Sequence, residues 1–275
     1  MVQALQERFP RPSVVGVLNV TPDSFSDGGV HLDPARAAAA AWRMVADGAA
    51  LVDVGGESTR PGSEGVTSDE ELRRVVPVLE QLARELPVSI DTAKADVARR
   101  ALELGAMFVN DVTALRADPE LAGVVADAGA YVCLMHMHGE PRTMQDDPRY
   151  DDVVAEVKRF LEERLAFATA QGIPESRIAL DPGIGFGKTV EHNLELLRRL
   201  REIAAIGRPV VVGTSRKSFL GRLTGGRPEQ ERLPGTIATN VIAFERGATV
   251  FRVHDVAQVG DALTVAAATV GAVHE

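Results

Sequence analysis

The sequence predicts a single α/β domain folded as an eight-stranded (β/α)8 TIM barrel, and three observations lead to this prediction. The chain has 275 residues, a length at which such a barrel forms one domain. Short runs rich in β-branched residues alternate eight times with longer amphipathic stretches, as repeated βα units around a parallel sheet do. No Ser/Gly linker, low-complexity tract or internal repeat divides the sequence, so we expect one domain over residues 1–275.

The expected strands are short, and a helical pattern follows each of them. They lie at 14–18, 50–54, 88–90, 107–109, 131–135, 178–180, 210–213 and 249–253. Three connections, 19–33, 55–67 and 136–150, are longer than the ~2–6 residues usual for a βα loop. We expect these three loops to bind ligands or to act as lids.

Two helix starts are indicated by capping residues. Asp33 followed by Pro34 offers a side-chain cap with proline in the first turn, and Ser68 followed by Glu71 has the spacing of a capping box. Pro77 falls within the helical pattern of 68–85 and lacks a backbone donor. We therefore expect a kink or an interruption at Pro77.

The composition argues against a nucleic-acid-binding or membrane protein. The formal net charge is −9 and no block of Lys or Arg occurs, whereas a phosphate backbone requires a basic face. The N-terminal residues lack the apolar core of a signal peptide, and no apolar run approaches the ~18 residues of a membrane span. Cys133 is the only cysteine, which excludes an intrachain disulfide and a Cys-based zinc cluster. We expect a cytoplasmic protein.

Polar residues follow all eight expected strands, where the active site of such a barrel is built. These are Asn19; Glu57, Ser58, Thr59 and Arg60; Asp91; Asn110 and Asp111; His136; Asp181; Ser215, Arg216 and Lys217; and Arg252 with His254. Helix capping can explain a short acceptor such as Asp91. It does not explain Lys217, Arg252 and His254, which bring cationic donors to the same rim and predict an anionic ligand.

Three features of the sequence allow other interpretations. The segment 181–189 is not a phosphate-binding P-loop, because Gly183 lies four positions before Gly187 rather than five, and its glycines do not match the dinucleotide fingerprint either. His136 and His138 could begin a metal site or simply line a polar loop. Lys217 could form a Schiff base, although the adjacent Arg216 favours a charged hydrogen-bond donor.

Seven segments together resemble the dihydropteroate synthase family. They are GVLNVTPDSFSDGG (16–29), DVGGESTRPGSE (53–64), SIDT (89–92), NDVTA (110–114), LDPGIGFGKT (180–189), GTSRKSFLG (213–221) and RVHDV (252–256). The resemblance spans about residues 14–256 with the motifs in family order. It implies a transferase of folate biosynthesis that condenses 6-hydroxymethyl-7,8-dihydropterin pyrophosphate with p-aminobenzoate, releases pyrophosphate, uses Mg²⁺ and forms a homodimer.

The resemblance also implies a role for individual residues. The catalytic residues would be Asp23, Asp91, Lys217, Arg252 and His254. The pterin would contact Asp91, Asn110, Met135, Asp181, Phe186, Gly213 and Lys217. The pyrophosphate would contact Asn19, Thr59, Arg60, Arg252 and His254, and Asn19 would also bind Mg²⁺. The p-aminobenzoate would contact Phe25, Arg60, Pro61, Phe186, Lys217 and Ser218.

Two alternatives stay open at this point. Pterin-binding domains of corrinoid methyltransferases share the DPG and Asn-Asp features, but the 19–29 and 58–62 loops and the 215–218 segment favour the synthase. A non-catalytic pterin-binding paralogue would not need Asn19, Arg60, Arg252 and His254 together.

Overall fold

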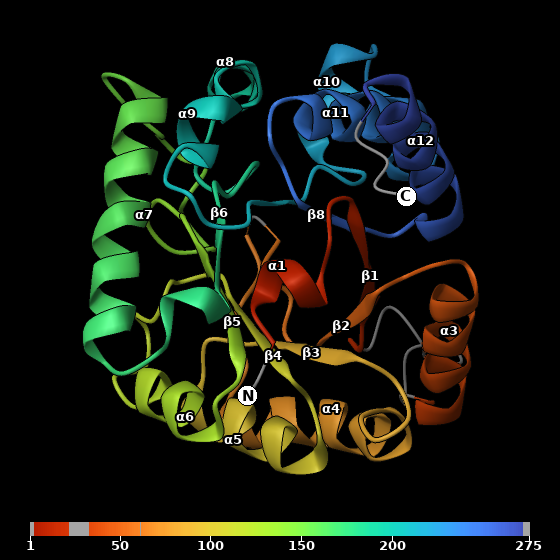
Figure 1. The fold of residues 1–275 in the computed structure, drawn as a ribbon, viewed down its shortest axis with the longest axis vertical. Coiled ribbons are helices and arrows are strands. Elements are labelled where there is room, and N and C mark those ends of the chain that lie inside the picture. Colours follow the sequence, from red (N-terminus) through yellow and green to blue (C-terminus); the bar gives the residue numbers. More distant parts are fainter. Residues whose placement is uncertain (1–2, 22–32, 61, 272–275) are drawn as a thin grey trace.

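The computed structural model describes residues 3–21, 33–60 and 62–271 as a barrel of parallel strands surrounded by helices (Figure 1). The strands are β1 (Ser13–Asn19), β2 (Leu51–Gly55), β3 (Val88–Asp91), β4 (Phe108–Asp111), β5 (Tyr131–Met135), β6 (Ile178–Asp181), β7 (Val211–Val212) and β8 (Val250–Val253). Each lies within two residues of an expected strand, so the predicted (β/α)8 barrel is confirmed.

The strands are hydrogen-bonded in the order β6-β5-β4-β3-β2-β1-β8-β7, and every ladder is parallel. A parallel bridge between Leu180 and Val210 joins the two ends of this sheet and closes the barrel. Closure leaves no edge strand exposed and brings all eight carboxyl ends to one mouth.

Helices cover the outside of the barrel. They are α3 (Pro34–Ala46), α4 (Ser68–Leu82), α5 (Ala95–Leu104), α6 (Leu121–Ala128), α7 (Val153–Ala170), α8 (Val190–Arg198), α9 (Leu200–Ala204), α10 (Ser218–Leu223), α11 (Leu233–Glu245) and α12 (Val256–Thr269), with 3₁₀ turns η1 (Glu175–Arg177) and η2 (Glu229–Glu231). The short helix α1 (Leu5–Arg8) lies elsewhere, at one end of the barrel (Figure 1). As predicted, Asp33 caps α3, accepting from the backbone N–H groups of Ala35 (3.0 Å) and Arg36 (3.2 Å).

Helix α4 departs from the expected capping and continues through Pro77. Its N-cap is Thr67, whose hydroxyl accepts from the Glu70 N–H at 3.3 Å, so Ser68 and Glu71 do not form the expected capping box. The Glu71 carboxylate is instead buried against Lys94, 2.6 Å away. Pro77 does not interrupt α4. It costs the helix one internal hydrogen bond, while the buried Val75, Val78 and Leu79 hold the helix against the sheet.

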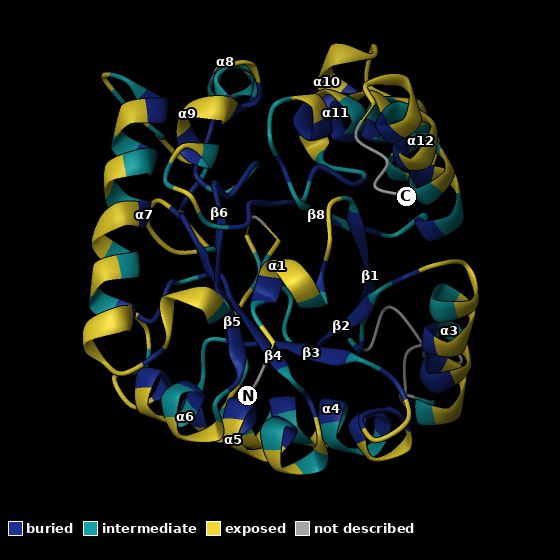
Figure 2. Ribbon diagram, viewed as in Figure 1, coloured by how far each residue is buried: buried dark blue, intermediate teal, exposed yellow. Residues whose placement is uncertain are grey.

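Figure 2 shows that the strands are buried along most of their length. Alternation along the strands separates the buried apolar residues into two clusters. Outward residues such as Val52, Val109 and Val132 pack under the helices, while inward residues such as Val15 and Cys133 fill the barrel. Helix α1 lies across one end of the barrel (Figure 1) and inserts Leu5 and Phe9 into the inner cluster. The Phe9 ring meets Phe108 and Tyr131 edge to face, with centroids 6.1 and 6.0 Å away, so aromatic rings plug the end opposite the mouth.

Within the described ranges, no helix combines the length and apolar character that crossing a membrane would require.

Candidate active site

The inward positions near the mouth are polar, in contrast to the apolar layer below them. Asp53 ends up beside Ser89 across the β2–β3 ladder, Asp91 beside Asn110 across β3–β4, and Asp181 beside Met135 across β5–β6. Asp111 behaves differently, because it turns outward and accepts from the N–H (2.8 Å) and hydroxyl (2.7 Å) of Thr113. Asp111 is therefore a structural turn residue.

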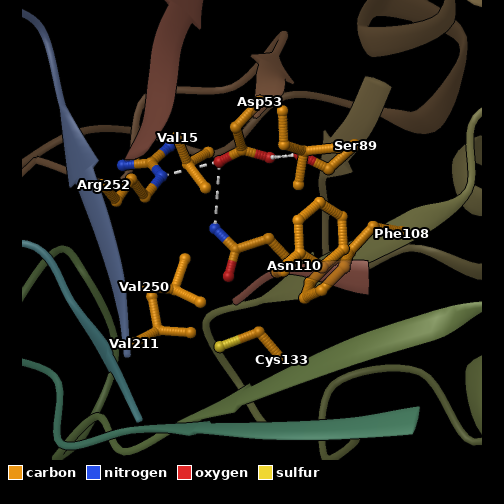
Figure 3. A pocket seen from close by; sticks show the side chains of 11 residues that line it. Val15, Asp53, Ser89, Phe108, Asn110, Cys133, Val211, Val250 and Arg252 are labelled. Atoms are coloured by element: carbon orange, nitrogen blue, oxygen red, sulfur yellow. Dashed lines mark hydrogen bonds and ion pairs between the residues drawn. The ribbon is translucent and has the colours of Figure 1, made fainter. Parts of the chain in front are cut away.

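Asp53 is the centre of the polar layer (Figure 3). Its Oδ1 accepts from the Ser89 hydroxyl at 2.6 Å, and its Oδ2 accepts from Asn110 Nδ2 at 3.2 Å and from Arg252 Nε at 2.6 Å. The carboxylate is almost completely buried. No site role was assigned to Asp53 from sequence, although a single carboxylate in the apolar run Leu51–Gly55 was a signal that something must pair with it.

Arg252 joins Asp53, in the middle of β2, to Asp91, at the end of β3. Its Nη2 donates to Asp91 Oδ2 at 2.6 Å while its Nε contacts Asp53. Burial alone would lower the pKa of Arg252, but the charges of Asp53 and Asp91 raise it overall. Desolvation raises the pKa of Asp91 to about 7, because the attraction of Arg252 does not offset burial and the neighbouring carboxylates.

A small cavity lies below this layer, between the polar groups and the aromatic plug (Figure 3). It measures about 20 Å³, is lined by apolar side chains including Val15 and Val250, and reaches Asp53, Asn110 and Arg252. Such a volume accommodates about one water molecule and no substrate. Ligands must therefore bind above the polar layer, at the mouth.

The glycine-rich loop 182–189 forms one wall of the mouth, above the polar layer. Asp181 is buried at its start, and its Oδ1 accepts from the Gly183 N–H at 2.7 Å. Phe186 packs against a cluster that contains Met135, and Lys217 Nζ lies 4.6 Å from the centre of the Phe186 ring. Lys217 also donates to the Ile184 carbonyl. Desolvation lowers the pKa of Lys217 to about 8, although the charge of Asp181 opposes that shift.

Gly213 lies between the two main cations of the site. A methyl group in place of its hydrogen would stand 3.9 Å from both Arg252 Cβ and Lys217 Nζ. The absence of a side chain leaves room at the mouth between these residues.

His254 is held by Ser215. The His254 backbone N–H donates to Ser215 Oγ at 3.1 Å, and the same hydroxyl lies 3.0 Å from the ring nitrogen Nδ1. With the ring proton on Nε2, the hydroxyl donates its one proton to Nδ1 and accepts the hydrogen bond from the backbone N–H at the same time. Burial, together with the charges of Arg252 and Arg216, lowers the pKa of His254 to about 4. His254 is thus a neutral hydrogen-bond donor near pH 7.

Asn19 and Asp91 present oxygens on either side of Gly55. A methyl group at Gly55 would lie 3.7 Å from Asp91 Oδ2 and 3.8 Å from Asn19 Oδ1. A carboxamide and a carboxylate oxygen are suitable ligands for Mg²⁺, which keeps several waters and takes further oxygens from a phosphate substrate. The residues present therefore fit that ion, although no described group of three His, Cys, Asp or Glu side chains could hold a metal unaided.

The 55–67 loop brings Arg60 to the rim but not into the polar layer. Arg60 is mostly exposed and forms a bidentate ion pair with Glu229 of η2 at 3.1 and 3.2 Å. Its charge nevertheless contributes to the low pKa of His254. Thr59 lies beside it on the loop, and Ser218 is exposed as the first residue of α10. Asp23, Phe25 and Pro61 lie outside the described residues.

His136 does not have the surroundings of a metal ligand. Its Nδ1 lies 2.9 Å from the Nζ of the buried Lys188, and burial followed by the charge of Lys188 lowers its pKa to about 2. His138 is exposed and its ring lies 5.6 Å from that of Tyr150. The sequence did not predict this role for Lys188, because the residue belongs to the glycine-rich motif and no pattern there indicates its buried contact with His136.

Comparison with known proteins adds independent findings. The family model described as "Pterin binding enzyme" matches residues 15–254. Dihydropteroate synthase of Escherichia coli K12 is 48% identical over 263 residues, covering 95% of this chain and 93% of the relative. The Xanthomonas albilineans dihydropteroate synthase with 4-aminobenzoic acid is 49% identical, with TM-score 0.89 and coverage of 96% and 95% of the two chains. The same enzyme with 7,8-dihydropteroate gives 46% identity, TM-score 0.85 and the same coverage.

Proposed function

The chain belongs to the dihydropteroate synthase family of pterin-binding enzymes, and from this premise we propose how its residues divide the reaction between them. The reaction joins 6-hydroxymethyl-7,8-dihydropterin pyrophosphate to p-aminobenzoate and yields 7,8-dihydropteroate and pyrophosphate. One observation carries the assignment of the site: two buried carboxylates, Asp91 and Asp181, share a single mouth with the cations Arg252 and Lys217.

The pterin would lie against the glycine-rich loop. Its amidine-like edge offers N–H donors, for which the buried Asp181 carboxylate is a matched acceptor, with Asp91 and Asn110 beside it. Lys217 would donate to ring oxygen and nitrogen from the other side. Met135 and Phe186, which belong to the same apolar cluster, would pack on the ring face, and Gly213 would leave room for the ring edge.

The pyrophosphate would bind the donors on the β1 and β8 side of the mouth. Arg252 supplies a guanidinium and His254 a neutral N–H, while Asn19, Thr59 and Arg60 would complete the set. Asn19, with Asp91 across Gly55, would hold Mg²⁺. When bound, this ion supplies positive charge that stabilises the negative charge on departing pyrophosphate.

Chemistry would proceed by loss of pyrophosphate and then attack by the amine. As the bond between the pterin methylene carbon and the pyrophosphate oxygen breaks, its electron pair leaves with pyrophosphate, which Arg252 and His254 stabilise. The ionised Asp91 would stabilise the resulting pterin cation. The p-aminobenzoate nitrogen then forms a bond to the methylene carbon and loses one proton to water. Asp23 is proposed to assist on the 19–33 loop.

The p-aminobenzoate would bind at the outer part of the mouth. Phe186 and Lys217 reach it from the floor, Ser218 offers a hydroxyl at the start of α10, and Arg60 offers a guanidinium for its carboxylate. Phe25 and Pro61 would complete the pocket. Closure of the 19–33 and 55–67 loops would exclude water while the cation exists.

We also propose an oligomeric state and a cellular location. A homodimer would use the outer faces of α11 and α12, where Ile242 and Val265 are exposed apolar side chains. A cytoplasmic location agrees with the buried thiol of Cys133, the only cysteine. Sedimentation of the wild type beside Val265→Glu tests the dimer, which the added charge should dissociate.

The direct test is to incubate the protein with both substrates and Mg²⁺ and to measure pyrophosphate and dihydropteroate together. Equal amounts of the two products are expected, with neither in the presence of EDTA. An Asp181→Ala variant that kept wild-type affinity for the pterin would contradict the assignment of the pterin site. Tight pterin binding without either product would favour a non-catalytic or methyl-transferring relative.

A further inference from the structure

We propose that Lys188 is a positioning residue that fixes the backbone of segment 183–187, the platform on which the pterin ring lies. The inference rests on the proposed function for the identity of the ligand, but its structural basis is separate. Lys188 would not touch the substrate. It would act through Phe186, whose ring the platform presents to the mouth.

The carbonyl groups of four consecutive residues in this platform each accept a hydrogen bond from a side chain. Gln145 Nε2 donates to Gly185 O at 2.7 Å, Lys188 Nζ to Phe186 O at 3.0 Å and Tyr150 Oη to Gly187 O at 2.8 Å. Lys217 donates to Ile184 O. A loop ordinarily leaves such groups to water, so side-chain donors at four successive peptides fix the orientation of each.

Lys188 is the most buried of these donors, and it ties the platform to the residue that follows β5. It is 3% exposed, and its Nζ also contacts His136 Nδ1 at 2.9 Å and His136 O at 3.5 Å. Its Nζ thus lies within hydrogen-bonding distance of three polar atoms, two on His136 directly after β5 and one on Phe186 in the loop. In the described part of the chain it forms no ion pair with a carboxylate. Burial lowers the pKa of Lys188, and the charge of Asp181 opposes that effect.

The backbone of the loop lies directly on residues 136–138. A methyl group at Gly183 would stand 1.8 Å from His136 O, and one at Gly187 would stand 2.7 Å from His138 Cβ. Both glycines also have positive φ, 67° and 62°. The backbone of the loop therefore lies close to that of residues 136–138, but the glycines have no side chains that could link the two segments. Lys188 supplies that link.

A platform fixed before binding does not have to be ordered by the ligand, so its loss should weaken binding of the ring more than it slows the chemical step. Lys188→Met keeps length and apolar volume but removes all three hydrogen bonds. We expect the Kd for 6-hydroxymethyl-7,8-dihydropterin pyrophosphate to rise about tenfold. The KM for this substrate should rise by a larger factor than kcat falls, and amide hydrogens of 183–188 should exchange faster.

The experiment compares wild type, Lys188→Met, Tyr150→Phe and the control Lys158→Met, a change at a partly exposed position of α7. Binding of the pterin pyrophosphate is measured by calorimetry, and hydrogen exchange by mass spectrometry of peptides covering 181–190. Tyr150→Phe removes only the donor to Gly187 O and keeps the ring, so a smaller change in the same direction is expected. The control should match the wild type in both measurements.

Unchanged exchange and unchanged Kd in folded Lys188→Met would overturn the proposal. Faster exchange with an unchanged Kd would overturn it too, because Lys188 would then be merely structural. If Lys188→Met does not fold, Tyr150→Phe decides by the same two measurements. Failure of the wild type to make dihydropteroate would refute the proposed function alone, since its affinity for the pterin and the exchange of 183–188 are measured independently of turnover.

Discussion

Replacement of Asp53 by Asn should separate the role of its charge from the role of its shape. Asp53 accepts from one charged donor, Arg252, and from two neutral donors, Ser89 and Asn110. The amide of the variant keeps one acceptor oxygen, but it turns an NH₂ group toward the remaining donors. Breaking a buried ion pair costs roughly 3–5 kcal/mol, and Arg252 keeps Asp91 as a second partner. We therefore expect a loss of about 2–3 kcal/mol in the free energy of unfolding.

The assay is denaturant unfolding of Asp53→Asn, Arg252→Met and the double variant, with Ser89→Ala as the matched control. Ser89→Ala removes one neutral hydrogen bond and should cost only about 1 kcal/mol. The double variant should be more stable than the sum of the two single losses in unfolding free energy predicts, because each single change removes one member of the ion pair and leaves the other charge buried. Additive losses within about 0.5 kcal/mol, or a loss no larger than that of Ser89→Ala, would refute the view that Asp53 and Arg252 form a coupled pair.

The remaining predictions concern the reaction. The kcat/KM for the pterin substrate should rise as pH increases through about 7, where Asp91 ionises, and fall through about 8, where Lys217 loses its proton. Lys217→Arg should remove the fall in kcat/KM at alkaline pH. An unchanged fall in this variant would exclude Lys217 as its source. Arg60→Ala should raise the KM for p-aminobenzoate about tenfold, because one charged hydrogen bond to the substrate is lost. The melting temperature should not change, because Arg60 is exposed. Equal KM values in the variant and the wild type would exclude this contact. Ser215→Ala should lower kcat about tenfold by freeing the His254 tautomer, while Ser215→Thr, which retains the hydroxyl, should restore part of it.

The barrel and most of the rim could be predicted because both depend on local sequence. Alternation and strand length fix which residues point inward, and barrel topology brings all carboxyl ends to one mouth. Asp91, Asn110 and Asp181 followed from their places directly after a strand. Similarity of motifs supplied the ligand, which geometry alone would not have named.

Contacts between distant segments were not predictable in this way. Asp53 lies in an apolar strand, so its buried carboxylate requires hydrogen-bond donors. Those donors, Ser89, Asn110 and Arg252, lie 36, 57 and 199 positions away in the chain. The pairing of Arg60 with Glu229, 169 positions apart, and that of Lys188 with His136 depend on loop conformations that no periodicity encodes. The expected capping box at Ser68 is wrong because Thr67, also a capping residue, takes the N-cap position one residue earlier.

The plugged end of the barrel has a practical consequence for handling the protein. Tyr131 Oη donates to the carbonyl of Gln3 at 2.6 Å, so the described N-terminal segment is attached beneath the barrel, and α12 also runs down from the mouth toward this side. A tether placed at either end of the described chain would therefore leave the mouth facing solution. Immobilisation on a sensor surface through such a tether should preserve substrate binding, whereas coupling through a residue introduced at Ser218 should obstruct it.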